Sequence, residues 1–142
     1  MMRSSTAMPA AEPSLAAYRN PLARYFAATR PAFLSVTFAA GVLGLAAAYA
    51  DGVALRPASA FLTLALALVA HAGINVLNDY YDALNGSDAA NTERRFPYTG
   101  GSRFIQNGVL SVHATRVLGA TLLAAVVPAG LLLAWQSGPG LV

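Results

Sequence analysis

The stretch AFLSVTFAAGVLGLAAAYA, residues 32–50, decides the fold class, because it runs for 19 residues without a charged side chain. At 1.5 Å rise per residue, such a helix is about 28 Å long, close to the thickness of the hydrocarbon core of a bilayer. Pro31 precedes the stretch and Asp51-Gly52 follows it, so the apolar segment has clear ends. The sequence therefore predicts a transmembrane helix at this position.

Two further apolar runs have the same length and character, residues 58–77 and residues 117–135. Pro57 stands at a favourable first-turn position for the former. Pro128 lies inside the latter, and membrane helices tolerate such an internal proline. The sequence thus predicts an all-α membrane protein with three transmembrane helices and a long loop over residues 78–116.

Composition agrees with a membrane protein and excludes an ordinary soluble domain. Of the 142 residues 56% are hydrophobic and 11% charged, whereas soluble domains carry roughly 25% charged residues. The chain has no cysteine, which excludes thiolate metal sites and thiol nucleophiles. All nine basic residues are Arg, and they flank the spans instead of lining one helix face. We therefore expect a lipid bilayer as partner and no nucleic acid.

The arginines also predict the orientation, because cytoplasmic segments of membrane proteins are enriched in basic residues. Only Arg56 lies in the short connection between the first two spans, and none follows Trp135. The other eight lie before the first span or between the second and third: Arg3, Arg19, Arg24, Arg30, Arg94, Arg95, Arg103 and Arg116. We expect a multi-pass protein of the inner (cell) membrane, with its N-terminus and long loop in the cytoplasm.

The N-terminal region before the first span divides into two parts. Residues 1–17 are small, contain proline and lack a pattern, so they are expected to form a disordered tail. Residues 18–30 either form a short helix on the inner leaflet or simply supply a basic flank. The domain itself is expected to span residues 18–142.

The segment HAGINVLNDYYDALNGSD, residues 71–88, carries the polar chemistry of the chain. If the second span continues as a helix, four polar residues share one face at i, i+4, i+7 and i+11: His71, Asn75, Asn78 and Asp82. Asp79 flanks this stripe, Asn85-Gly86 ends the helix, and Asp88 follows. A polar face on a membrane helix indicates a wet cavity or a polar partner.

Oxygen donors without a Cys or His cluster favour Mg²⁺, which is typically held by one or two carboxylates and by substrate phosphates. Arg94, Arg95 and Arg103 follow in the loop and are suited to neutralise a diphosphate. The structural alternative is a solvated helix end, with arginines that only satisfy the positive-inside pattern. His71 equally suits a structural role, with Asn75 as its partner. Tyr81 suits either contact with an aromatic acceptor or a role as an interfacial anchor.

Three segments resemble the UbiA-type superfamily of intramembrane prenyltransferases: TRPAFLSVTFAAGVLG (29–44), NDYYDALNGSD (78–88) and TGGSRFIQNG (99–108). The nearest branch is the one that prenylates 1,4-dihydroxy-2-naphthoate for menaquinone. The first Asp-rich motif of the family falls on Asn78 and Asp82. Gly86 followed by Asp88 is similar to the naphthoate branch and differs from the hydroxybenzoate branch.

The resemblance implies a bundle of nine helices in which Mg²⁺ joins the Asp-rich motifs to the diphosphate of a polyprenyl donor, next to an aromatic acceptor. It assigns the chemistry to Asn78 and Asp82. The implied metal ligands are Asn78, Asp79, Asp82 and Asp88. The substrate contacts that we expect are Asn75, Tyr81, Arg94, Arg95 and Arg103.

The family has a second Asp-rich motif, whereas no carboxylate follows Glu93 in this chain. The chain is therefore expected to be the N-terminal third of such an enzyme, inactive without the missing C-terminal half. The alternative function is a non-catalytic three-span membrane protein that binds lipid or a partner.

Overall fold

The computed structural model describes residues 11–138, and within this range the chain is helical, without a β-strand. The helices are α1 (Pro21–Ala28), α2 (Pro31–Ala50), α3 (Pro57–Asn85), α4 (Ser87–Ala90) and α5 (Val112–Ser137). Helices α2, α3 and α5 are each long and apolar enough to cross a membrane. The predicted all-α fold with three such helices is confirmed.

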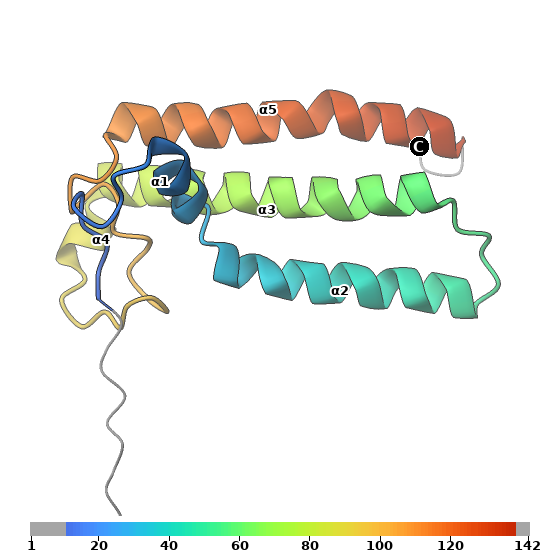
Figure 1. The fold of residues 1–142 in the computed structure, drawn as a ribbon, viewed down its shortest axis with the longest axis horizontal. Helices are drawn as coiled ribbons and strands as arrows, with labels where there is room; N and C mark the ends of the chain where they lie inside the picture. Colours follow the sequence, from blue (N-terminus) through green and yellow to red (C-terminus); the bar gives the residue numbers. More distant parts are fainter. Residues whose placement is uncertain (1–10, 139–142) are drawn as a thin grey trace, which may run out of the picture.

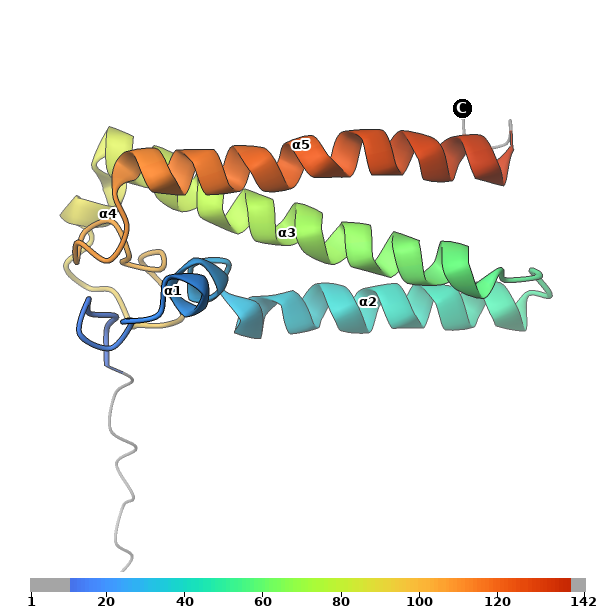
Figure 2. The same cartoon turned by 45° about the horizontal axis from the view of Figure 1, so that its top comes forward.

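The three long helices run side by side, and α3 packs against both α2 and α5 (Figures 1 and 2). Helices α1 and α4 gather with the loop of residues 91–111 at one end of this bundle. The connection of residues 51–56 lies at the other end, where α5 also ends. The N-terminal segment and the long loop therefore share one side, which agrees with the distribution of the arginines.

Local sequence explains where the helices begin and end. Proline occupies the first turn of α1, α2 and α3. A backbone N–H at this position would have no acceptor within the helix, so its absence in proline costs no hydrogen bond. The Ser111 hydroxyl caps α5 by accepting from the Ala114 N–H at 3.1 Å. Gly86, with a φ of +80°, ends α3. Hydropathy alone placed the end of the second span at 77 and the start of the third at 117, because the polar turns beyond those points are helical but not apolar.

Glycines bring α3 close to its neighbours. A Cβ atom on Gly119 of α5 would lie 2.8 Å from Leu77 Cγ of α3, and one on Gly73 would lie 2.9 Å from Leu123 Cγ. On the other side, a Cβ atom on Gly41 of α2 would lie 2.6 Å from Leu64 Cδ1. Close packing of this kind is a main source of helix association in a bilayer, where apolar burial from water does not drive it.

Two polar contacts join the helices within the bundle. His71 Nδ1 lies 2.7 Å from the Thr37 hydroxyl of α2, so its partner is Thr37 and not Asn75, the residue considered from the sequence. Asn75 instead donates to the Thr29 carbonyl, at 3.1 Å. The neighbouring segments satisfy both side chains because the part of the stripe formed by His71 and Asn75 faces α2 and the residue that follows α1.

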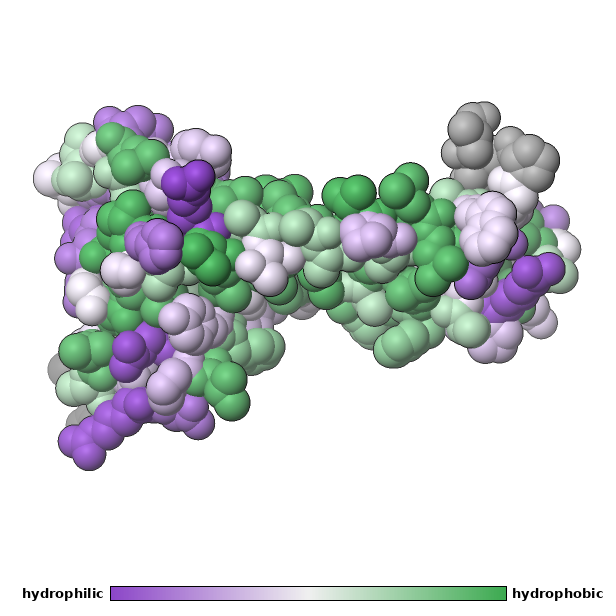
Figure 3. All heavy atoms as spheres, turned by 90° about the horizontal axis from the view of Figure 1, so that it is seen from above, coloured by the Kyte–Doolittle hydropathy of each residue, from purple (hydrophilic) through white to green (hydrophobic). Residues whose placement is uncertain are grey.

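The surface of the bundle is apolar along its middle and polar toward its two ends (Figure 3). None of the residues of α2, Pro31–Ala50, is buried. Large apolar side chains such as Leu43 and Leu131 are mostly exposed. This surface is consistent with contact with a lipid bilayer.

The structure describes the N-terminal region only from residue 11 onward. Residues 1–10 of the expected disordered tail lie outside the described residues. Residues 11–17 are described, and Glu12 and Pro13 contact the long loop. Of the two alternatives for residues 18–30, the structure shows a short helix, α1, capped by Asn20.

Candidate functional site

Two buried carboxylates meet at Gly101. Asp79, in the last turns of α3, and Asp88, in α4, are each 4% exposed. A Cβ atom on Gly101 would lie 2.8 Å from Asp79 Oδ1 and 2.7 Å from Asp88 Oδ2. Gly101 has a φ of +70°, a conformation that favours glycine. The loop thus brings an α-carbon without a side chain against both acids.

Neutral donors make the hydrogen bonds to the carboxylates of this acid pair, and the positive charges of Arg103 and Arg30 act on it from nearby. The Ser102 N–H donates to both oxygens of Asp79, at 3.1 and 3.2 Å. Gln106 Nε2 donates to Asp88 Oδ2 at 3.0 Å. Burial raises the pKa of Asp88 above its usual 3.8, and the nearby carboxylate of Asp82 raises it further. A cation at this position would stabilise the ionised forms.

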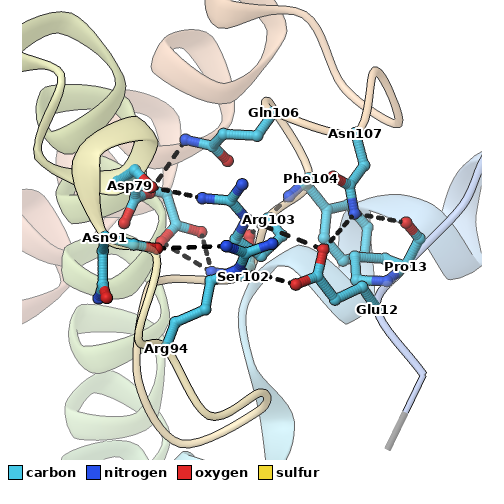
Figure 4. Close-up of polar contacts among 11 residues, drawn as sticks. Glu12, Pro13, Asp79, Asn91, Arg94, Ser102, Arg103, Phe104, Gln106 and Asn107 are labelled. Carbon is cyan, nitrogen blue, oxygen red and sulfur yellow. Dashed lines mark hydrogen bonds and ion pairs between the residues drawn. The ribbon is translucent and has the colours of Figure 1, made fainter.

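Arg103 lies between the acid pair and the N-terminal segment, as Figure 4 shows for Asp79 and Glu12. Arg103 is 8% exposed, and its φ of +62° is unusual for a residue other than glycine. Arg103 Nη1 donates to the Asp88 carbonyl at 2.6 Å. Its Nε is buried and has no hydrogen-bond partner among residues 11–138. A buried donor without a partner costs about 1–3 kcal/mol.

Glu12 faces the opposite side of Arg103. Arg94 Nε donates to Glu12 Oε1 at 2.7 Å, and Asn107 Nδ2 donates to Glu12 Oε2 at 3.2 Å. Arg103 Nε is 4.0 Å from that second oxygen. The hydrogen bonds from Arg94 and Asn107 lower the pKa of Glu12 below its usual 4.5. At neutral pH a carboxylate anion therefore sits among three donors.

A cavity of about 270 Å³ adjoins the acid pair, because Gly101 and Ser102 form part of its wall. The remaining wall comes from the N-terminal segment, α1, the start of α2 and the loop. It is rich in aromatic side chains and includes one cation: Tyr18, Phe26, Phe33, Phe96, Phe104 and Arg30. Figure 4 shows how closely Phe104 follows Ser102 and Arg103 in this loop.

Arg30, which lines this cavity, contacts both the long loop and α2. It has a φ of +57° between α1 and α2. Its Nη2 donates to the Pro97 carbonyl at 3.2 Å, and its Cζ lies 4.2 Å from the centre of the Phe33 ring. Non-glycine residues at positive φ cost about 1–3 kcal/mol and concentrate at functional sites. Arg30 and Arg103 both have this conformation, and both lie next to the acid pair.

The other residues predicted from the sequence lie around this centre. Asn78 Nδ2 donates to Asp82 Oδ2 at 2.7 Å on the more exposed side of α3. Asn75 lies one turn deeper. Tyr81 is 60% exposed with its ring edge-on to Tyr80, and the side chain of Arg95 is exposed. The structure therefore brings together Asp79, Asp88, Arg94 and Arg103, and leaves Tyr81 and Arg95 outside.

The donor chemistry fits Mg²⁺ in part. Residues 11–138 contain no group of three Asp, Glu, His or Cys side chains arranged to hold a metal ion. Asp79 and Asp88 nevertheless offer two carboxylates at one point, with Asp82 close enough to affect Asp88. Mg²⁺ sites commonly use one or two carboxylates and take the other oxygens from water and substrate phosphate.

Several contributors were not identified from the sequence: Glu12, Arg30, Ser102, Gln106 and Asn107. The segment TGGSRFIQNG carried a signal for three of them, because its Gly-Gly pair indicates a tight turn. Glu12 carried none, since it stands in a stretch without pattern.

Comparisons with protein-family models, with curated proteins and with solved structures found no match to this chain.

Proposed function

We propose that these residues form the N-terminal part of a UbiA-type intramembrane prenyltransferase, which transfers a polyprenyl group from its diphosphate to an aromatic acceptor. The acceptor is 1,4-dihydroxy-2-naphthoate, in menaquinone biosynthesis. One observation carries the proposal: Asp79 and Asp88 meet at Gly101 beside the buried Arg103, at one end of three apolar helices. These residues lie in two of the segments that resemble the family.

In this proposal the acids bind Mg²⁺ and the arginines bind the diphosphate. Asp79 and Asp88 would hold the cation where they meet, and Asp82, which lies near Asp88 and accepts from Asn78, would add to the negative charge around it. Bound Mg²⁺ supplies charge that stabilises the departing diphosphate. Charged donors such as those of Arg94 and Arg103 stabilise the same oxygens as negative charge develops on them.

The aromatic cavity is the position that we assign to the acceptor. Its ring-lined wall favours an aromatic ligand, because aromatic pairs pack with favourable edge and offset geometry. Arg30 supplies a cation for an anionic group on that ligand. The prenyl tail would run along the apolar helices. Because the diphosphate binds at the acid pair and the acceptor in the cavity, the reacting carbon of the donor would lie between them. The site lies at the cytoplasmic side of the inner membrane in this proposal, since seven of the eight arginines among residues 11–138 lie at its end of the bundle.

Turnover of the complete enzyme tests this assignment. Asp82→Asn keeps the size of the side chain but removes a charge, so we expect a loss of at least about 100-fold in prenyl transfer. Asp51→Asn, at the C-terminal end of α2 and so at the other end of the bundle, is the matched control and should keep normal turnover. Membrane insertion should be the same in both. A non-catalytic protein that binds lipid or a partner would show no transfer and would tolerate both substitutions.

A further inference from the structure

Three hydrogen-bond donors converge on Glu12 from the long loop. Arg94 Nε and Asn107 Nδ2 bond to its two oxygens, and Arg103 Nε points toward the same group from 4.0 Å (Figure 4). Two guanidinium groups and an amide are a donor set typical of oxyanion sites, because charged donors bind carboxylates and phosphates strongly. Glu12 therefore occupies a position suited to an anionic ligand.

The carboxylate fills this position incompletely. Each of its two oxygens has one donor, and Arg103 Nε is left without a hydrogen bond among the described residues, 11–138. The Arg103 side chain is only 9% exposed, so water does not readily replace the missing partner. A terminal phosphate group has three oxygens and offers one to each of the three donors. The site thus matches phosphate better than it matches its present occupant.

The segment that carries Glu12 is anchored at a distance from the site. The Tyr18 ring packs on Phe104 with 5.1 Å between ring centres, and the Tyr18 carbonyl accepts from Arg24 Nη2 at 3.0 Å. Among residues 11–17, the hydrogen bonds to the loop are the two of Glu12 and one from Asn107 to the Pro13 carbonyl at 2.9 Å. Release of residues 11–17 therefore breaks three hydrogen bonds and exposes Pro13, while the contacts of Tyr18 remain.

We propose that Arg94, Arg103 and Asn107 form a binding site for a phosphate group of the diphosphate, and that Glu12 is a built-in competitor which the substrate displaces. The identity of the ligand rests on the proposed function. Glu12 reduces the apparent affinity of the site by the fraction of time that it occupies it. Without substrate, the same contact closes the arginine cluster to other anions.

The affinity of the chain for inorganic diphosphate tests this competition. We would titrate the chain in phosphatidylcholine nanodiscs, with and without Mg²⁺, by calorimetry. Glu12→Gln keeps the shape of the side chain and should tighten diphosphate binding at least about fivefold, as expected when an occupant that fills a site most of the time is removed. Glu93→Gln is the matched control, since it removes the same charge from an exposed residue of the loop.

Hydrogen exchange of the unmodified chain gives a second readout that needs no variant. Diphosphate should increase exchange at residues 11–17, because it displaces Glu12 and frees that segment. Nanodiscs that contain phosphatidylglycerol but no diphosphate form the comparison. Faster exchange only with the anionic lipid would assign the site to a lipid headgroup and would overturn the claim for diphosphate.

The outcomes separate this inference from the proposed function. Equal affinities of Glu12→Gln and the unmodified chain, with unchanged exchange, would overturn the competition while Mg²⁺-dependent binding still supported the function. Tighter binding by Glu12→Gln without any effect of Mg²⁺ would support the phosphate site and contradict the prenyltransferase half-site. Absence of diphosphate binding in every variant would overturn both.

Discussion

At Gly101 the backbone, and not a side chain, separates the carboxylates of Asp79 and Asp88. A methyl group there would lie 2.8 Å from one and 2.7 Å from the other, shorter than real contacts of a Cβ atom. The positive φ adds strain for any residue with a side chain. The geometry of the candidate cation site therefore depends on this glycine.

Gly101→Ala should lower the free energy of unfolding by about 1–3 kcal/mol, the usual cost of an unfavourable backbone conformation, and should weaken Mg²⁺-dependent diphosphate binding. Unfolding in mixed micelles measures the first effect and a diphosphate titration the second. Gly44→Ala is the control, because its Cβ atom would meet nothing within 4 Å on the surface of α2. Normal stability and binding of Gly101→Ala would contradict the described approach of the acids.

Asp88 is predicted to oppose stability at neutral pH. Its pKa is raised in the folded protein, so the folded state binds the proton more tightly than the unfolded chain does. The contribution of Asp88 to stability is thus greatest at low pH and is lost as the pH rises from 3.8 through the raised value.

Asp88→Asn removes this charge and should raise the melting temperature by a few degrees at pH 7, while Mg²⁺-dependent diphosphate binding is lost. The gain in stability should disappear below pH 3.8, where Asp88 is protonated in both states. Thermal scans from pH 3 to pH 8 measure it. A variant that is less stable than the parent at pH 7 would show that Asp88 has a purely structural role.

Among individual residues, helical spacing predicted the relative positions of those on α3, whereas Arg94 and Arg103 of the loop could be named from the sequence but not placed. The period of a helix placed Asn78, Asp79 and Asp82 together, because α3 continues to Asn85. No periodicity applies to the loop, so the positions of Arg103 and Asn107 relative to Glu12 depend on tertiary contacts across many residues. Helical spacing also favoured Asp82, whereas the buried acid of α3 is Asp79.

At the scale of the elements, α3 positions the site because it contacts both other long helices. Gly119 lets α5 approach Leu77 and so fixes the last turns of α3, where Asp79 lies. Gly119→Val should overpack this contact and lower the free energy of unfolding by about 1–3 kcal/mol. Gly130→Val, in the same helix with open space around the glycine, is the control and should be tolerated. Equal unfolding curves for the two variants would contradict the packing of α5 on α3.

The three spans were predictable because hydropathy alone identifies a helix that crosses a bilayer. The polar extensions of these spans were predictable only in part. Beyond residue 77, the helical spacing of the polar stripe predicted that α3 continues, whereas no such pattern marks the part of α5 before residue 117. The order of packing, with α3 between α2 and α5, follows from close contacts at Gly41, Gly73 and Gly119. Glycines are visible in a sequence, but their partners are not.

At the scale of the whole molecule, one end of the bundle carries all candidate site residues. The absence of cysteine from the chain allows single-cysteine labelling to determine which side that end faces. Glu93→Cys lies in the long loop and Ala54→Cys in the short connection at the opposite end. A membrane-impermeant maleimide added to intact cells, after opening of any outer membrane, should label Ala54→Cys and spare Glu93→Cys. The reverse pattern would place the site outside the cytoplasm.

The most direct test of the cation and diphosphate site is a ³¹P NMR titration of inorganic diphosphate with the chain in nanodiscs, with and without Mg²⁺. The unmodified chain should bind diphosphate in a Mg²⁺-dependent manner, and so should the control Asp51→Asn. Asp79→Asn and Asp88→Asn should each weaken that binding at least about tenfold, about 1.4 kcal/mol, with unchanged helix content. An affinity for diphosphate that does not depend on Mg²⁺, or that is the same in all four proteins, would contradict a diphosphate site built on Asp79 and Asp88.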